Sequence, residues 1–196
     1  METEQALLAW QTRYGGNPPL GFVLRLAYQS VWTRIHYLPD GVRPATNERD
    51  QKVAVARLSD VADELFSNRD VLVIALHLDS RDEEIGILRP MGATAISPAN
   101  GWAEVLDDHF VHPGSGEFSA LMLRWRHAIL DPLWLAAARD RIGRVAVFCP
   151  ATGDAFCPYD GGADFFVWKL GERVRLRGRF RAWLPATGVP GSLAPE

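Results

Sequence analysis

Hydrophobic side chains recur at helical spacing in two segments near the start of the chain. Residues 3–14 place Trp10 on one apolar face, and a Gly-Gly-Asn-Pro-Pro run ends the pattern. Residues 48–66 carry a longer apolar stripe. Asn47 precedes this stripe and Asp50 follows three positions later, which resembles a helix cap. We therefore expect a helix in each segment.

Other apolar runs have the length and the β-branched composition of strands. Residues 71–78 (VLVIALHL) form an uninterrupted run, which predicts a central strand covered on both faces. Residues 31–38 alternate as in a strand, and residues 22–28 are also interpreted as a strand, with a helix as the alternative. Further strands are expected at residues 118–125, 145–149, 154–158 and 164–168.

Three segments have weaker patterns. Residues 80–116 are polar and interrupted by proline and glycine, which predicts a long connection with a short turn of helix near Trp102. Pro132 suits the first turn of a helix over residues 132–142. Residues 173–184 have apolar positions at helical spacing, although several of them also fit a strand.

Together these elements predict an α+β fold. We expect a single domain over residues 1–184, in which helices pack against a mixed, mainly antiparallel sheet. The Pro- and Gly-rich residues 185–196 are expected to form a flexible tail. With 196 residues and a hydrophobic content of 47%, the chain can bury a core without a disulfide or a metal.

Charge and cysteine content narrow the classes of function. The chain has 21 Lys and Arg against 24 Asp and Glu, and this net charge of −3 argues against a nucleic-acid binder. No apolar run has membrane-spanning length, and the first residues lack a signal-peptide pattern. The two cysteines, Cys149 and Cys157, exclude a disulfide scaffold, and we interpret them as buried free thiols. The expected location is the cytoplasm.

The most distinctive motif is the segment 156–164, which reads FCPYDGGAD. Its paired glycines allow a tight turn between two strands, with Asp160 and Asp164 at the two ends. Two carboxylates a turn apart can share a metal ion or work as general acid and base. We favour the alternative, in which the Asp accepts backbone N–H bonds and stabilises the turn. Tyr159 is likewise interpreted as a packed residue rather than an acid catalyst.

The same motif carries a family resemblance. Together with residues 33–38 (TRIHYL) and residues 173–184, which end in Arg181, Trp183 and Leu184, it resembles the bacterial family catalogued as domain of unknown function 3885. The likeness spans most of the chain, although the turn lacks the Arg that some members carry. The resemblance implies an α+β fold, a bacterial origin and a helix in residues 173–184, and it implies no particular reaction.

A second cluster of polar residues could hold a metal. Asp107, Asp108, His109 and His112 lie within six residues, and His with carboxylate is a set that transition metals accept. The cluster lacks the helical spacing and the Glu of a zincin motif. We therefore favour a solvated acidic loop over a metal site.

Aromatic and arginine residues offer candidate binding surfaces. The chain has seven Trp, and such residues dominate both cores and binding hot spots. Trp32 lies close to Arg34, and Trp125 lies between Arg124 and Arg126, so both are candidates for a partner surface if exposed. The five arginines of residues 173–181 could meet an acidic partner or nucleic acid, but a solvated face is favoured.

The sequence contains no assembled catalytic motif. P-loop, GxGxxG, GxSxG and paired CxxC motifs are all missing, and no cofactor is expected. We therefore expect a protein-binding module of immunity type that neutralises a toxin by direct binding. Its partner would be a basic toxin domain, met by acidic residues of segment 80–116 that include Asp107 and Asp108. The alternative is a metal-dependent hydrolase that uses Asp160, Asp164 and residues 107–112. The sequence leaves the oligomeric state open.

Overall fold

The computed structural model describes residues 1–77, 83–97, 102, 117–142 and 144–186. In this part of the chain, seven strands form one sheet in the order β1-β7-β6-β5-β2-β4-β3, and every neighbouring pair is antiparallel. The strands are β1 (Trp32–His36), β2 (Asp70–His77), β3 (Thr94–Ile96), β4 (Glu117–Arg124), β5 (Val145–Phe148), β6 (Ala155–Tyr159) and β7 (Gly162–Phe166). The predicted α+β class is confirmed, and its sheet is antiparallel throughout.

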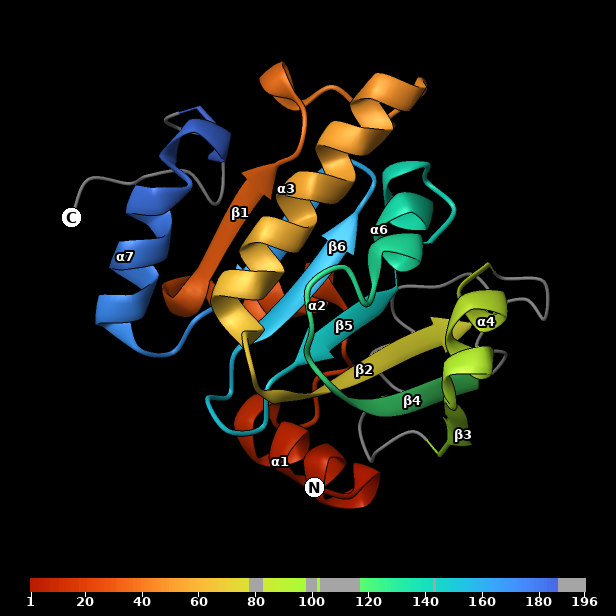
Figure 1. Ribbon diagram of the computed structural model, residues 1–196. Helices are drawn as coiled ribbons and strands as arrows, with labels where there is room; N and C mark the ends of the chain where they lie inside the picture. The colour runs from red at the N-terminus through yellow and green to blue at the C-terminus, as the bar shows by residue number, and fades with distance from the viewer. Residues whose placement is uncertain (78–82, 98–101, 103–116, 143, 187–196) are drawn as a thin grey trace.

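Helices cover both faces of this sheet. On one face lie α1 (Thr3–Tyr14) and α2 (Gly21–Ala27), and on the other lie α3 (Glu48–Phe66), α6 (Asp131–Ala138) and α7 (Leu170–Arg179). In Figure 1, α3 and α6 are in front of the sheet and α2 is behind it. The described residues also form five short helices: α4 (Glu83–Leu88), η1 (Gln29–Val31), η2 (Pro39–Gly41), η3 (Arg89–Met91) and η4 (Arg181–Trp183).

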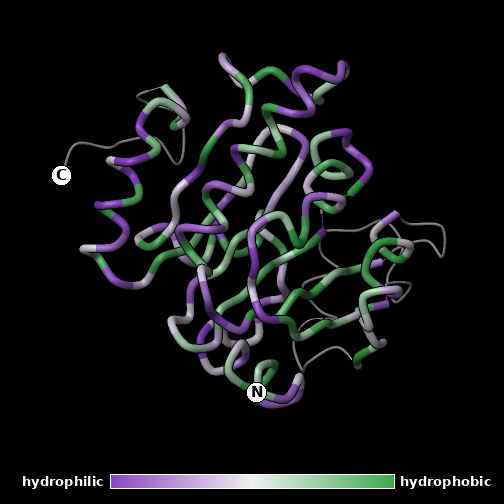
Figure 2. The backbone as a smooth tube through the Cα atoms, viewed as in Figure 1, coloured by the Kyte–Doolittle hydropathy of each residue, from purple (hydrophilic) through white to green (hydrophobic). Residues whose placement is uncertain are grey.

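Strand β2 shows why the core divides into two layers. Val71, Val73 and Ala75 face the α3 side, whereas Leu72 and Ile74 face the α1 side, and all are fully buried. A strand that is covered on both faces needs apolar residues at every position, which is the pattern that the sequence shows. Figure 2 shows hydrophobic residues along the central strands and hydrophilic residues over much of α7.

Several predicted elements are confirmed with small shifts. Helix α1 has the expected bounds, and α3 begins after Asn47, whose side chain accepts a 2.9 Å hydrogen bond from the Asp50 backbone N–H. Residues 170–179 form the helix α7 that the family resemblance implied. Helix α6 ends at Ala138, four residues before the predicted end, because Asp140 adopts a positive φ of 58°.

Two predictions about secondary structure were wrong. The segment expected as a strand at residues 22–28 is the helix α2. Its buried Val23 and Leu24 belong to the hydrophobic layer on one face of the sheet, so α2 packs on the sheet and is not one of its strands. Segment 80–116 was expected to be an irregular connection, but its described part holds α4, η3 and the edge strand β3. These elements are three to six residues long, which is too short for hydrophobic periodicity to reveal.

The remaining predictions about segment 80–116 concern residues that lie mostly outside the described part of the chain. Trp102 is buried against Phe118, but the rest of the short helix expected near it lies outside the described residues, as does the tail at 187–196. Among the helices that the structure describes, none has both the length and the apolar character that crossing a membrane would require.

Candidate anion-binding pocket

One end of the sheet, formed by β1, β7 and β6, brings charged residues together. In the antiparallel register Arg34 lies opposite Asp164, and Asp164 lies opposite Cys157. Because side chains alternate along a strand, Trp32, Arg34 and His36 share the face on which α2 packs. The other face of β1 carries the buried Thr33 and Ile35.

Asp164 is the buried centre of this cluster. Its Oδ1 accepts hydrogen bonds from Arg34 Nε at 2.9 Å and from Trp32 Nε1 at 2.8 Å, and its Oδ2 accepts one from Arg34 Nη2 at 3.2 Å. Arg25 of α2 approaches Oδ2 at 3.9 Å. This bidentate pairing fixes the orientation of the Arg34 guanidinium. It also occupies both carboxylate oxygens.

The Arg34 guanidinium lies close to two aromatic rings. It lies 5.2 Å from the Trp32 ring centre and 5.3 Å from that of Tyr159, within the range of cation–π contacts. Burial alone would lower the pKa of Arg34, but the hydrogen bonds and the charge of Asp164 outweigh it and raise that pKa. Asp164 uses two of the five guanidinium N–H groups, so others remain for a ligand.

A pocket of about 350 Å³ opens next to this guanidinium. Its lining combines basic side chains with two glycines and one tyrosine: Arg25, Arg34, His36, Gly41, Arg43, Tyr159 and Gly161. The side chains of Arg25 and Arg43 are 38% and 61% exposed, whereas that of Arg34 is 15% exposed. The pocket is therefore basic: it combines the largely buried Arg34 with two more exposed arginines, Arg25 and Arg43, which we call its rim.

His36 lines the pocket in a partly buried position among basic side chains. Burial, then the charges of Arg34 and Arg43, lower the pKa of His36, while Asp164 acts weakly in the opposite direction. Gly41 passes close above the ring: it has a positive φ of 67°, and a Cβ there would lie 3.2 Å from His36 Cε1. A neutral imidazole packed in this way can still take up a proton if a negative charge enters the pocket.

The turn after β6 completes the pocket. Burial, followed by the charge of Asp164, raises the pKa of the Tyr159 hydroxyl, so it stays protonated and can donate a hydrogen bond. Asp160 in the turn lies 3.7 Å from Arg43. At Gly162 a Cβ would lie only 1.9 Å from the carbonyl oxygen of Ile35, so β7 can approach β1 only with glycine there.

The structure brings together five of the residues that the sequence singled out, Trp32, Arg34, Tyr159, Asp160 and Asp164. It gives Asp164 a different role from the two considered, because the carboxylate accepts side-chain donors of β1 rather than capping the turn or holding a metal. Asp107, Asp108, His109 and His112 lie outside the described residues. Within the described residues, no three His, Cys, Asp or Glu side chains form a group that could hold a metal ion.

Two other expectations concern buried residues. Trp125 does not form a partner surface, because it is 2% exposed and donates to Asp63 Oδ1 at 2.8 Å. Cys149 and Cys157 are free and buried, as expected, and they pack in the layers on opposite faces of the sheet. Burial, aided by the charge of Asp164, raises the pKa of the Cys157 thiol. Cys157 is therefore a packing residue rather than a nucleophile.

Sequence reasoning missed three of the four basic lining residues, namely Arg25, His36 and Arg43. The two-residue spacing of Arg34 and His36 on a predicted strand was a signal that both share one face. Arg25 and Arg43 gave no such signal, because they come from α2 and from the segment after η2. Only the packing of these elements against β1 places them at the pocket.

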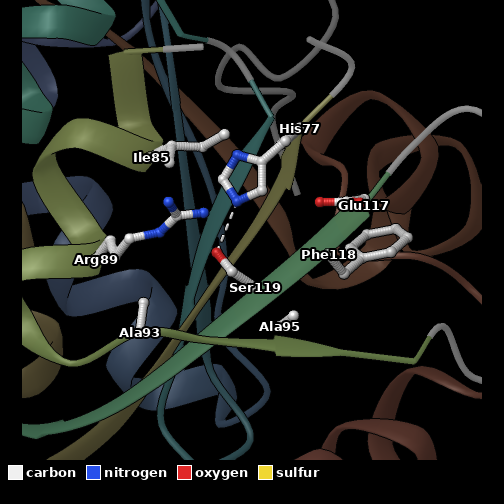
Figure 3. A pocket seen from close by; sticks show the side chains of 8 residues that line it. All are labelled: His77, Ile85, Arg89, Ala93, Ala95, Glu117, Phe118 and Ser119. Atoms are coloured by element: carbon white, nitrogen blue, oxygen red, sulfur yellow. Dashed lines mark hydrogen bonds between the residues drawn. The ribbon is translucent and has the colours of Figure 1, made fainter. Parts of the chain in front are cut away.

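A second, smaller cavity lies beside β2 and β4. Figure 3 shows His77 of β2 and Ser119 of β4 pointing toward one another, with His77 Nε2 and Ser119 Oγ 2.7 Å apart. Such a contact is typical of an activated serine nucleophile. The cavity beside it measures about 40 Å³, which is room for about one water molecule and not for a substrate. The basic pocket is therefore the stronger candidate.

The fold and the pocket define a class of protein: an α+β protein with an antiparallel sheet, helices on both faces and a basic pocket at one edge strand. The chain belongs to the family described as "Domain of unknown function (DUF3885)", whose model matches residues 20–187. This match includes every residue of the pocket. No curated protein and no solved structure matches the chain.

Proposed function

We propose that this chain is a protein-binding module of immunity type, which neutralises a toxin by holding an acidic group of that partner in the basic pocket. The observation that carries this proposal is the basic pocket itself, in which Arg34 is fixed by Asp164 and lies near the rings of Trp32 and Tyr159. Two exposed aliphatic residues are next in sequence to its other arginines. Leu26 follows Arg25 and is 64% exposed, and Val42 precedes Arg43 and is 55% exposed. Apolar contacts around a charged anchor are the usual composition of a protein-binding surface.

The rigidity of the pocket supports binding. Asp164 and Trp32 hold Arg34 in one orientation before any ligand arrives, so little side-chain entropy is lost when a partner binds. Tyr159 and Trp32 lie beside Arg34, and Arg, Tyr and Trp are the residues most enriched at binding hot spots. We therefore expect this cluster to govern the dissociation rate of the complex.

Binding accounts for the site better than hydrolysis does. The proposed hydrolase would need Asp160 and Asp164 as metal ligands or as an acid and base pair. The Asp164 oxygens already accept three hydrogen bonds from Arg34 and Trp32. A carboxylate neutralised in this way is a structural partner of the guanidinium. We therefore propose the binding function alone.

Two predictions concern the charge of the partner: an acidic group that contacts the pocket, and a basic surface that contacts Asp107 and Asp108. The basic pocket requires an acidic group at the contact surface of the partner. The expected contact of a basic toxin domain with Asp107 and Asp108 involves residues outside the described part of the chain. Both contacts can occur in one complex if the partner is basic overall and presents one acidic side chain to the pocket.

The experiment uses the products of the two genes that flank this one, since toxin and antitoxin are expressed together. Each product is expressed alone and with this protein, and both growth and binding affinity are measured. We expect one product to be toxic, to be neutralised by the wild type and to bind the Arg25→Glu and Arg43→Glu variants more weakly. Arg126→Glu, at an exposed position, is the charge-matched control. Two outcomes contradict the proposal: full neutralisation by a double variant that carries both Arg25→Glu and Arg43→Glu, or no neutralisation by the wild type.

A further inference from the structure

We infer that the basic pocket binds the dianion of a phosphate group, either free phosphate or a phosphorylated side chain of the partner. This inference rests on the proposed function in one respect, since it specifies the acidic group that the pocket holds. Three features of the pocket support a phosphate ligand: the arrangement of its donors, its charge and the position of His36.

The donors approach the pocket from three parts of the fold. Arg25 comes from α2, Arg34 from β1 and Arg43 from the segment after η2. A carboxylate offers two oxygens in one plane, whereas a phosphate offers three terminal oxygens that point in different directions. Three guanidinium groups around one cavity, with the Tyr159 hydroxyl as a further donor, therefore suit phosphate better than carboxylate.

The charge of the pocket distinguishes the same two ligands. The three arginines face two carboxylates, Asp160 and Asp164, which leaves a net charge of +1 while His36 is neutral. A monoanionic carboxylate would balance this charge without any proton. A phosphate dianion would leave one negative charge, which a proton on His36 neutralises. A proton on the imidazole of His36 therefore favours a dianionic ligand over a monoanionic one.

The charged and titratable groups near His36 come from several elements of the fold. Arg34 is on the same strand, Arg43 follows η2, Asp164 is on β7, and Tyr159 and Asp160 are at the end of β6. Arg57 of α3 donates to the His36 backbone carbonyl at 3.5 Å. Burial, followed by the charges of Arg34 and Arg43, lowers the pKa of His36, and the opposing effect of Asp164 is smaller. A bound dianion opposes this shift, and binding then becomes tighter as the pH falls.

The test measures anion binding by isothermal titration calorimetry on the full chain. Sulfate is the first probe, because it stays a dianion, whereas phosphate monoesters titrate near about pH 6. We expect sulfate to bind, to take up protons in a comparison of two buffers, and to bind more tightly at about pH 6 than at about pH 8. Acetate, a monoanion over this range, should bind weakly and without proton uptake.

Variants at the rim keep the buried Arg34 pair intact. Arg25→Gln and Arg43→Gln should each weaken sulfate binding by about tenfold, because each removes charge-assisted hydrogen bonds. Arg126→Gln, which removes one arginine from an exposed position elsewhere, should leave sulfate binding unchanged. His36→Gln should still bind sulfate but lose the proton uptake.

Two further arms identify the source of the phosphate. Inorganic phosphate is compared with a phosphoserine peptide and with the same peptide carrying glutamate. Preference for either phosphate form over the glutamate peptide supports the inference, and the tighter of the two names the source. Equal binding of the glutamate peptide, no binding of sulfate and phosphate, or binding that survives Arg25→Gln with Arg43→Gln overturns it.

These outcomes are separable from those of the proposed function. If the Arg25→Glu, Arg43→Glu double variant loses sulfate binding but still neutralises the toxin, the protein-binding role of the pocket is wrong and the phosphate site stands. If the double variant loses neutralisation although the wild type binds no dianion, the phosphate site is wrong and the binding role stands.

Discussion

Strands β2 and β1 belong to the same sheet but differ in what their side chains do. In β2 the residues from Val71 to Leu76 are apolar and fully buried, and each face contributes to a hydrophobic layer. In β1 one face carries the buried Thr33 and Ile35, and the other carries Trp32, Arg34 and His36. An interior strand is covered on both sides and serves stability, whereas the edge strand leaves room for charged groups that recognise a ligand. Substitutions in the two strands should therefore have different consequences.

The largest expected effect comes from removing the buried charge beside β1. Asp164→Ala leaves the Arg34 guanidinium, whose side chain is 15% exposed, without its carboxylate partner. Breaking a buried pair in this way costs about 3–5 kcal/mol. We expect urea denaturation to show a loss of this size in the free energy of unfolding. A loss below about 1 kcal/mol would show that the pair is effectively solvated.

In β2 a substitution should affect stability alone. Ile74→Ala creates a cavity at a fully buried position and should cost about 2–5 kcal/mol in the free energy of unfolding. Val174→Ala, at a position that is 51% exposed on α7, is the control and should change stability little. At temperatures where Ile74→Ala is folded, its sulfate affinity should match that of the wild type. A changed sulfate affinity would show that β2 contributes to ligand binding as well as to stability.

The third prediction concerns the contact between β7 and β1. Gly162→Ala places a Cβ against the backbone carbonyl of Ile35, so the strands must move apart, at about 1–3 kcal/mol of lost stability. Gly161→Ala is the matched control, because the atoms nearest to its Cβ belong to the side chains of Tyr159 and Arg43, at 3.0 and 3.1 Å, and not to the backbone. Thermal denaturation should show a lower Tm for Gly162→Ala than for Gly161→Ala. The reverse order would contradict the close approach.

The smallest effect is a pH dependence of stability. The pKa of His36 is lowered in the folded state, so below about pH 6.5 the unfolded chain binds more protons there, and stability falls as the pH decreases. His36→Gln should remove this contribution. His127 provides the opposite case, because its hydrogen bond to Asp63, and then the charge of Asp63, raise its pKa.

For His127 the stability contribution is present below about pH 6.5 and is lost as the pH rises through the folded pKa. Unfolding curves at several pH values should therefore show slopes of opposite sign when each variant is compared with the wild type. Slopes of the same sign for His36→Gln and His127→Gln would contradict the electrostatic description of the pocket.

The fold was largely predictable where a local pattern repeats over many residues. Helix α3 and strand β2 were predicted to within about one residue at each end, because 19 and 8 residues respectively carry an uninterrupted pattern. The apolar positions of α2 fit a strand as well as a helix over seven residues, so the local pattern misassigned it. Strand β3 has only three residues and exists through its pairing with β4. In both cases the tertiary contacts decide the secondary structure.

The candidate site was predicted only in part for the same reason. The glycine turn with its flanking carboxylates predicted Tyr159, Asp160 and Asp164 as site residues, and the nearby tryptophan and arginine predicted Trp32 and Arg34. The function expected of Asp164 was nevertheless different from the one observed, because its partner lies 130 residues away in the chain. A local sequence pattern cannot predict a contact between residues so far apart in the chain.

The sequence by itself determined the α+β class, the family, the central buried strand and the existence of a glycine turn flanked by charges. These properties depend on periodicity and on neighbouring residues, which a single chain displays directly. Only the tertiary structure decided that the turn faces β1, that Asp164 neutralises Arg34, and that Arg25, His36 and Arg43 surround one cavity. The physical reason is that a pocket is built from elements distant in sequence, whose relative positions are fixed by core packing and strand register.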